Sequence, residues 1–346
     1  MHPETPNLDE HLARRGITRR HFLAFCGAIA STLALPRAAY ATRIAAAFET
    51  RLATGLRPPV VWLEFQDCTG DTESFLRCND PAVIDVLFDV VSLNYHETLM
   101  SPAGAAATRS LEETVAGYAG QYLCIVEGAI PTAAGGAFCL IGGRSALSIA
   151  QTVISQAALT VAAGACAVDG GLPGAQPNPT GAVGVARAVP NAPNLVNMPG
   201  CPVNGVNLMA VLVHYLTNGS LPALDSQRRP QSIYGTRIHQ GCPRREHGEV
   251  DFYGDLRHRN GGCMRELGCK GPVTYSNCYR QNWNGGTSWP IGAGALCIGC
   301  TNANFWDTMT PFFAGGEVGE GGDDGDGDDD GDGDNNGGIG DGDDDD

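Results

Sequence analysis

Cysteines are the residues of this chain with the clearest potential for chemistry, since 13 occur among 346 residues. Three of them, Cys68, Cys166 and Cys201, lie in glycine-containing turns directly after short apolar runs. A buried thiol without a chemical role is the ordinary interpretation of any one of them. Three in equivalent places favour a shared site, because ligands of open parallel sheets bind beyond the carboxyl ends of the strands. Thiolates from separate loops suit the soft irons of an iron–sulfur cluster.

A denser group of possible ligands follows in the last third of the chain. His239-x-x-Cys242 with Cys263 and Cys269 forms one possible four-ligand set, and Cys278, Cys297 and Cys300 form a three-thiol set. Zinc is the competing interpretation, since such spacings also suit a tetrahedral zinc site. Zinc has no redox role and explains neither the three-thiol set nor the three loop cysteines. The spacing therefore favours iron–sulfur clusters over zinc.

The elements that must position these residues predict an α/β protein. Between residues 58 and 221, short apolar runs alternate with stretches of helical period, which is typical of a parallel sheet covered by helices. We expect strands at 60–65, 123–127, 159–163 and 195–198, and helices at 80–91, 144–157 and 206–216. From 222 to 314, Gly, Pro, Arg and Cys dominate, so we expect a loop-rich second domain held together by metal ligation.

Charge is distributed very unevenly along the chain. The formal net charge is −16, but residues 317–346 hold 15 acids and no Lys or Arg, which leaves 23 acids against 22 bases in the first 316 residues. Such a balance argues against nucleic acid as a partner, because binding there requires a basic surface.

The Asp/Gly tail at 315–346 should be disordered, since it has almost nothing to bury. Asp326, Asp328, Asp330 and Asp332 resemble the start of a calcium-binding loop. Gly337 stands where such a loop would need its last acid, so we expect no calcium site in the tail.

The N-terminus has the features of a twin-arginine export signal at residues 1–41. T-R-R-H-F-L at 18–23 is followed by an apolar run at 24–35 and by the small-x-small triplet at 39–41, with cleavage expected after Ala41. Cys26 would leave with the signal, and 42–57 would be a linker. An amphipathic first helix is the alternative. Because this pathway moves folded proteins, it favours metal clusters over disulfides. No later segment reaches the length of a membrane-spanning helix, so we expect no anchor in the mature chain.

Taken together, the motifs resemble the small subunits of nickel–iron hydrogenases over nearly the whole chain. Besides the signal, the resemblance rests on V-V-W-L-E-F-Q-D-C-T-G-D-T-E-S at 60–74, V-E-G-A-I-P-T at 126–132, G-A-C-A-V-D-G-G at 164–171, P-N-P-T-G-A at 177–182, P-G-C-P at 199–202, I-H-Q-G-C-P-R at 238–244, E-L-G-C-K-G-P-V-T at 266–274, C-I-G-C at 297–300 and F-W-D-T-M-T-P-F at 305–312. The motifs occur in the order and at the spacing of the family.

The resemblance implies a flavodoxin-like domain at 58–221 and an iron–sulfur domain at 222–314. It implies a proximal 4Fe-4S cluster held by Cys68, Cys166 and Cys201, a distal 4Fe-4S cluster held by His239, Cys242, Cys263 and Cys269, and a medial 3Fe-4S cluster held by Cys278, Cys297 and Cys300 beside the non-ligating Pro290. His239 would be a neutral nitrogen donor.

One position departs from the usual family pattern. Asp71 stands where C-x-x-C after the first strand would place a second cysteine. Three outcomes follow: Asp71 ligates iron, Cys78 from the next helix replaces it, or the site holds three irons. We favour the carboxylate, because the spacing is kept and an Asp here resembles an actinobacterial-type subgroup. Glu73 and Glu127 match family positions near this cluster, and each is as compatible with a structural role as with a redox role.

Two cysteines, Cys124 and Cys139, lie outside the ligand motifs, and we expect both to be buried structural thiols. The resemblance implies that hydrogen reacts at a nickel–iron site in a separate large subunit and that no catalytic residue lies in this chain. Electrons would pass through the three clusters to a cytochrome or another acceptor.

We therefore expect an exported, periplasmic or extracytoplasmic heterodimer or a higher oligomer of it. Two other interpretations compete with this one. The first is a subunit related to respiratory quinone-reducing complexes, and the second is an exported binding protein stabilised by zinc or disulfides, with a calcium-binding tail.

Overall fold

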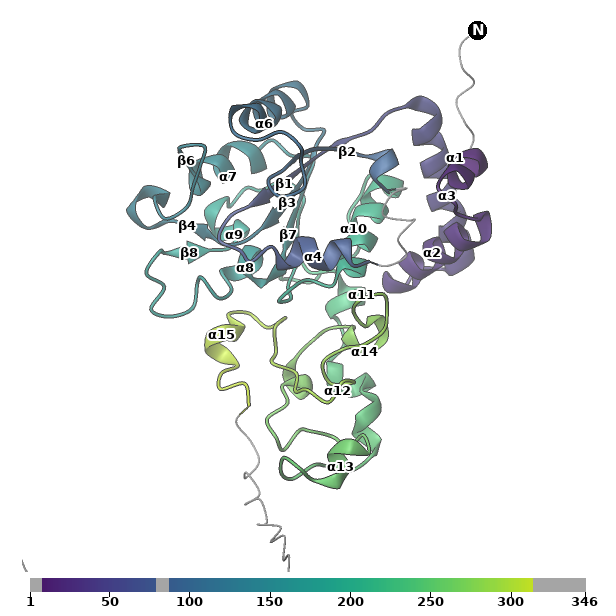
Figure 1. The fold of residues 1–346 in the computed structure, drawn as a ribbon, viewed down its shortest axis with the longest axis vertical. Coiled ribbons are helices and arrows are strands. Elements are labelled where there is room, and N and C mark those ends of the chain that lie inside the picture. The colour runs from purple at the N-terminus through teal and green to yellow at the C-terminus, as the bar shows by residue number, and fades with distance from the viewer. Residues whose placement is uncertain (1–7, 79–86, 314–346) are drawn as a thin grey trace, which may run out of the picture.

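A five-stranded parallel sheet forms the centre of the first domain in the computed structural model, which describes residues 8–78 and 87–313 (Figure 1). The strand order is β2-β1-β3-β7-β9. The strands are β1 (Pro59–Glu64), β2 (Ser92–His96), β3 (Leu123–Glu127), β7 (Leu159–Ala163) and β9 (Leu195–Met198). Two short antiparallel pairs accompany the sheet: β4 (Ile130–Pro131) with β8 (Ala182–Val183), and β5 (Leu140–Ile141) with β6 (Arg144–Ser145).

Helices cover both faces of the sheet because the inner strands are apolar at successive positions. Val60 and Trp62 of β1 belong to one buried cluster, whereas Val61 and Leu63 belong to the other, as the two-residue period of a strand requires. One face is covered by α6 (Ala105–Gly117) and α7 (Ala146–Ile154), and the other by α10 (Gly205–Asn218). The remaining helices of this domain are α4 (Gly70–Leu76), η1 (Ala133–Gly136), α8 (Gly164–Asp169) and α9 (Val185–Ala188).

The α/β class and the four expected strands are confirmed, but the prediction omitted two elements. β2 pairs in parallel with β1 at the edge of the sheet, and its sequence S-L-N-Y-H is too polar to be recognised as a buried run. The prediction also omitted α6. The helix expected at 144–157 begins only at Ala146, after the strand β6. Most of the helix expected at 80–91 lies outside the described residues; residues 87–90 are helical.

The second domain consists of loops and very short helices, as its composition predicted. Its helices each have three or four residues: α11 (Gln231–Tyr234), α12 (Ile238–Gly241), η2 (Pro243–Glu246), α13 (Leu256–Arg259), η3 (Gly271–Val273), α14 (Cys278–Gln281) and α15 (Phe305–Thr308). Its small buried cluster includes Cys242, Cys278 and Cys297. The thiols themselves are therefore part of the core.

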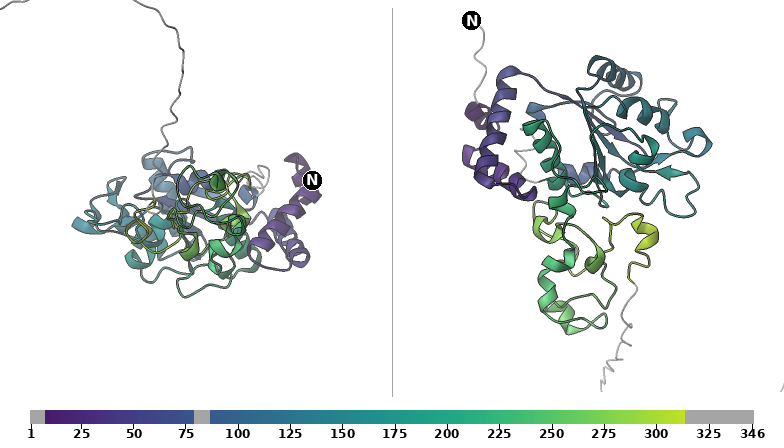
Figure 2. Two further views of the ribbon diagram at one scale, coloured as in Figure 1. Left: turned by 90° about the horizontal axis from the view of Figure 1, so that it is seen from below. Right: turned by 180° about the vertical axis from the view of Figure 1, so that it is seen from behind.

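Three N-terminal helices lie beside α10: the second and third pack against it, and the first packs on those two (Figures 1 and 2). They are α1 (Leu8–Arg14), α2 (Arg19–Thr32) and α3 (Arg37–Thr54). A linker was predicted at 42–57, but the residues up to Thr54 belong to the helix α3. Tyr40, Ile44 and Phe48 recur every four residues in this helix and form its buried stripe. Among the described residues, no single helix is long and apolar enough to span a membrane. Only α2 and α3 together have the required length and apolar composition, and the chain bends by 118° between them.

One glycine fixes the packing of the helix that carries Cys166. A Cβ atom at Gly184 would lie 2.0 Å from the carbonyl oxygen of Val168 in α8, although the backbone of Gly184 is extended and suits any residue. We expect Gly184→Ala to lower the free energy of unfolding by roughly 1–3 kcal/mol, because α8 must move to make room. Urea denaturation of the purified protein measures this change.

The matched control is Gly117→Ala at the end of α6, where a Cβ atom would meet nothing within 4 Å. It should be neutral or slightly stabilising, because alanine favours helix over glycine. Equal denaturation midpoints for the two variants would contradict the steric argument.

Candidate metal centres

The first group of predicted ligands gathers at the carboxyl edge of the sheet. Cys68 follows β1, Cys166 lies in α8 directly after β7, and Cys201 follows β9. Burial raises the pKa of Cys166 to about 12, and the charges of Cys201, Asp71 and Cys68 contribute to the increase. The same causes, burial and then the charges of Asp71 and Cys68, raise the pKa of Cys201 to about 11. The three thiols therefore lie close together at the strand ends, as the strand-end argument predicted, and Asp71 lies close to Cys166 and Cys201.

Asp71, and not Cys78, points into this group. Asp71 is 7% exposed, and its Oδ1 atom accepts a hydrogen bond of 2.5 Å from the backbone N–H of Val203, in the loop after Cys201. Its other neighbour is Gly164, at the start of α8, where a Cβ atom would lie 2.1 Å from Asp71 Oδ2. Cys78 packs instead against the first residue of α10, since a Cβ atom at Gly205 would lie 2.5 Å from its sulfur.

Glu127 holds the start of α4, which carries Asp71. This fully buried carboxylate, at the end of β3, accepts hydrogen bonds from Trp62 Nε1 at 3.0 Å and from the backbone N–H of Asp71 at 2.9 Å. The backbone N–H and the hydroxyl of Thr72 donate to it as well. These contacts give Glu127 a structural function, because it satisfies N–H groups that a helix start leaves free. Glu73 is exposed and pairs with Arg77, so it does not point into the group.

The second group lines one cavity in the loop-rich domain. His239, Cys242, Cys263 and Cys269 all border this cavity. Burial raises the pKa of Cys242, and the charges of Cys263 and Cys269 oppose its ionisation further. Burial, together with Arg245 and Arg265, lowers the pKa of His239, which keeps its ring neutral and able to donate a lone pair.

The third group lines an open cavity of about 660 Å³ between the other two. Cys278, Cys297 and Cys300 border it together with Pro290. Burial raises the pKa of Cys297 to about 12 and that of Cys300 well above its ordinary value. Ser276 Oγ lies 3.0 Å from Cys278 Sγ, a contact that the prediction missed although Ser276 stands only two residues away.

Direct contacts join the three groups in series. Cys201 of the first group lines the cavity of the third, and its backbone hydrogen-bonds to the sulfur of Cys300. At the other side, the backbone N–H of Cys297 donates to Cys269 Sγ of the second group at 3.4 Å. The third group is therefore the middle member of a continuous chain of sulfur sites.

The remaining thiols lie apart from these groups. Cys124 is fully buried in β3, as predicted, whereas Cys139 is only half-buried. Cys26 is fully buried in α2. All 13 cysteines lie among the described residues and none forms a disulfide, so nothing supports a disulfide framework.

The donor sets fit iron–sulfur clusters. Thiols with such high pKa values stay protonated at neutral pH unless a cation lies beside them, and a bound metal ion deprotonates a coordinating thiol outright. Eleven donors, nine of them thiols, converge from loops on two domains. Sulfur-rich sets of this kind are typical of iron–sulfur proteins.

Comparison with known proteins agrees with this chemistry. Residues 234–313 match the model of the C-terminal domain of the NiFe/NiFeSe hydrogenase small subunit, and residues 68–215 match that of the NADH ubiquinone oxidoreductase 20 Kd subunit. The chain is 42% identical over 310 residues to the periplasmic [NiFe] hydrogenase small subunit 1 of Nitratidesulfovibrio vulgaris. The aligned region covers 88% of this chain and 96% of that subunit.

Two further relatives are similar over comparable lengths. The uptake hydrogenase small subunit of Azotobacter vinelandii is 43% identical over 300 residues, 86% of this chain and 82% of the relative. The solved [NiFeSe] hydrogenase of Dm. baculatum superposes with a TM-score of 0.69 at 33% identity, covering 75% of this chain and 99% of that one. With its clustered thiols and these relatives along most of its length, the chain belongs to the family of nickel–iron hydrogenase small subunits.

Proposed function

We propose that the chain relays electrons between a nickel–iron site in a partner large subunit and an external acceptor, in the direction of hydrogen oxidation. The observation that carries this proposal is the unbroken series of ligand groups, in which Cys201 contacts Cys300 and Cys297 contacts Cys269. Electron transfer needs redox centres at short separations, and a zinc site would supply no such centre.

The donor sets support two 4Fe-4S clusters and one 3Fe-4S cluster. Cys68, Asp71, Cys166 and Cys201 would hold the proximal cluster, and His239, Cys242, Cys263 and Cys269 the distal one. The medial set offers only three thiols, Cys278, Cys297 and Cys300, and Pro290 beside them has no donor atom to offer. When bound, the clusters would supply one-electron chemistry, and the chain would fix their ligands.

The ends of the relay suit two different partners. Cys68 and Cys201 are exposed, so a partner must cover the proximal group to shield it from water. The large subunit would do so. His239 at the other end is half-buried, which gives a cytochrome or another acceptor access to the distal group. The rival interpretation as a subunit of a quinone-reducing complex accounts for residues 68–215 but not for 234–313.

Residues 1–41 would direct export by the twin-arginine pathway, which agrees with the periplasmic relative in Nitratidesulfovibrio vulgaris. The chain would then act outside the cytoplasm, on the periplasmic or outer side of the membrane.

Replacing both Arg19 and Arg20 by Lys should retain this chain and the large subunit in the cytoplasm, because the two would cross as one folded pair. Cell fractionation with antibodies to each subunit measures it. The control, Arg14→Lys at the exposed end of the preceding helix, should leave export unchanged. Export of the large subunit from the Arg19/Arg20 variant would contradict joint transport.

The fourth proximal ligand can be identified by iron counting. We expect Asp71→Ala to lose about one iron atom per chain, because the three remaining thiols match the donor set of a 3Fe-4S cluster. Asp71→Cys should retain all four with a shifted reduction potential, since thiolate is the softer and more covalent donor. Iron and sulfide analysis with electron paramagnetic resonance of the purified heterodimer measures both. Cys78→Ala should keep its full iron content; iron loss in Cys78→Ala but not in Asp71→Ala would make Cys78 the ligand.

The relay itself is tested at its outer end. Cys242→Ala should slow hydrogen-driven reduction of an external acceptor far more than hydrogen–deuterium exchange, because exchange needs only the large subunit. Cys139→Ala, which removes a thiol outside the three groups, should leave both rates unchanged. Equal loss of both activities in an assembled Cys242→Ala heterodimer would contradict the relay.

A further inference from the structure

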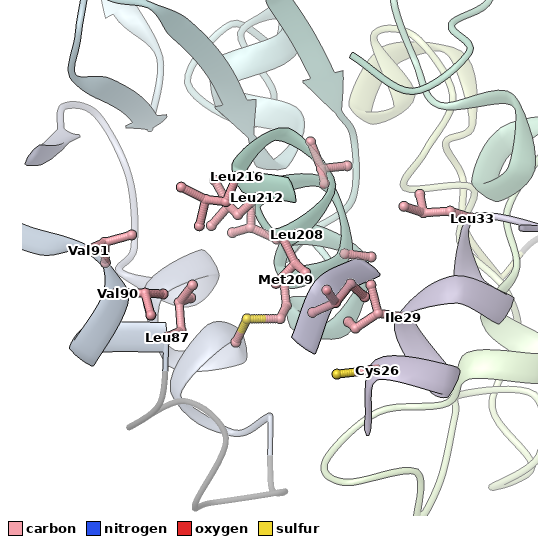
Figure 3. Packing of buried hydrophobic residues seen from close by; sticks show 14 of the residues in the cluster. Cys26, Ile29, Leu33, Leu87, Val90, Val91, Leu208, Met209, Leu212 and Leu216 are labelled. Atoms are coloured by element: carbon pink, nitrogen blue, oxygen red, sulfur yellow. The ribbon is translucent and has the colours of Figure 1, made fainter. Parts of the chain in front are cut away.

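The outer side of α10 is covered by the chain's own N-terminal helices. Phe22, Cys26 and Ile29 of α2 are fully buried and belong to one cluster with Met209 and Val213 of α10. Figure 3 shows Cys26, Ile29 and Leu33 directed toward α10. The helix that carries the apolar run of the expected export signal thus forms part of the buried core.

Polar contacts fix α3 at one place on α10. The hydroxyl of Tyr40 lies 2.6 Å from Nδ1 of His214, and both side chains are buried. Asn218 Nδ2 donates to the same hydroxyl at 2.5 Å, and Arg43 donates to Asn218 Oδ1 at 2.6 Å. Further along α3, Arg51 donates to the carbonyl oxygen of Leu216 at 2.9 Å. Directional contacts of this kind specify one register, which apolar collapse alone would not.

Two other contacts attach the same segment to the rest of the chain. His11 Nε2 in α1 lies 2.6 Å from Asp89 Oδ2, and Arg15, the residue after α1, donates to both oxygens of Asp89 at 2.6 and 3.0 Å. At the end of α2, Thr32 donates to Gln281 of the second domain at 3.0 Å. The segment is therefore attached to the first domain and to the second.

Docking hides the apolar run and the cleavage point of the expected export signal but leaves its arginine pair exposed. Arg19 and Arg20 lie at the surface, whereas Phe22 is fully buried and its ring lies 5.7 Å from that of Phe48 in α3. Tyr40 and Ala41, at the expected cleavage point, are 4% and 8% exposed and lie inside α3. A protease cuts such a segment only from the fraction of molecules in which it has opened.

We propose that residues 8–54 dock against the domain through α10 in the precursor and mask the apolar run and the cleavage point of the export signal until they detach. The occupant of this surface is the chain's own N-terminal segment, whose contacts are those just described. The docking holds whether or not the segment directs export. The masking rests on the export signal proposed above, so the two are tested separately.

Docking is tested by the reactivity of Cys26. Burial raises the pKa of this thiol to about 12, so in the docked chain it is both shielded and protonated. The protein carries the Arg19/Arg20 to Lys replacements, which keep it unprocessed, and is treated with N-ethylmaleimide before peptide mapping by mass spectrometry. Two neighbours on α3 supply a matched pair: Ala45 is 6% exposed within the cluster, and Ala46 is exposed.

Cys26 should be alkylated at least about tenfold faster in Ala45→Asp than in Ala46→Asp, because only Ala45→Asp places a charge in the interface. Iron content should stay equal in both, which shows that the cluster domains remain folded. Tyr40→Phe, which removes only the hydroxyl, should give a smaller increase. Equally fast alkylation of Cys26 in all variants and in the parent would overturn the docking, as would equal rates in Ala45→Asp and Ala46→Asp.

Masking is tested in chains that keep Arg19 and Arg20. If the signal must detach first, pulse-labelled Ala45→Asp should reach the periplasm faster than Ala46→Asp. Identical export rates, combined with faster alkylation of Ala45→Asp, would leave the docking standing and overturn the masking. Export of neither chain would overturn the proposed signal and the masking with it, while the alkylation result would still decide the docking.

Discussion

Burial of thiols away from water is the constraint on which the second half of the molecule depends. Cys278, Cys297 and Cys300 all have raised pKa values because burial disfavours their thiolates. Cys278 and Cys297 also belong to the small buried cluster of this region, whose helices never exceed four residues. Iron ligation would stabilise the thiolates and link distant loops at once, which couples folding of this region to metal binding.

The helix α10 connects the parts that depend on this constraint. It begins directly after the Cys201 loop, where Asn204 caps it by accepting from the backbone N–H groups of Val206 and Asn207. Asn207 exchanges a pair of hydrogen bonds, each 2.9 Å, with Asn277, the residue before Cys278. One short helix start thus sets the position of the medial ligands relative to the proximal ones. The opposite end of α10 carries His214 and Asn218, which hold the N-terminal helices.

Much of the fold was predictable because its signals are local. β1, β3, β7 and β9 are continuous apolar runs, and the ligand sets follow from short spacings together with the family motifs. β2 was missed because an edge strand alternates with polar residues, and α3 was missed because small alanines weaken its apolar stripe. The joining contacts Cys201–Cys300 and Cys269–Cys297 depend on residues brought together from different loops, and no local pattern encodes such distances.

The chemistry at Asp71 shows how the surrounding charges constrain a ligand choice. Burial raises the pKa of Asp71 to about 8, with the negative charge of Glu127 contributing to the increase and the N–H of Val203 opposing it. Glu127 is hydrogen-bonded to the backbone of α4 and cannot move away without freeing Asp71 N–H. At neutral pH this carboxyl group is therefore mostly protonated, and a cation beside it would favour the ionised form. Asp71 also accepts a hydrogen bond from the backbone N–H of Val203, and this bond fixes the Cys201 loop against α4. A thiolate at this position would make the same hydrogen bond more weakly.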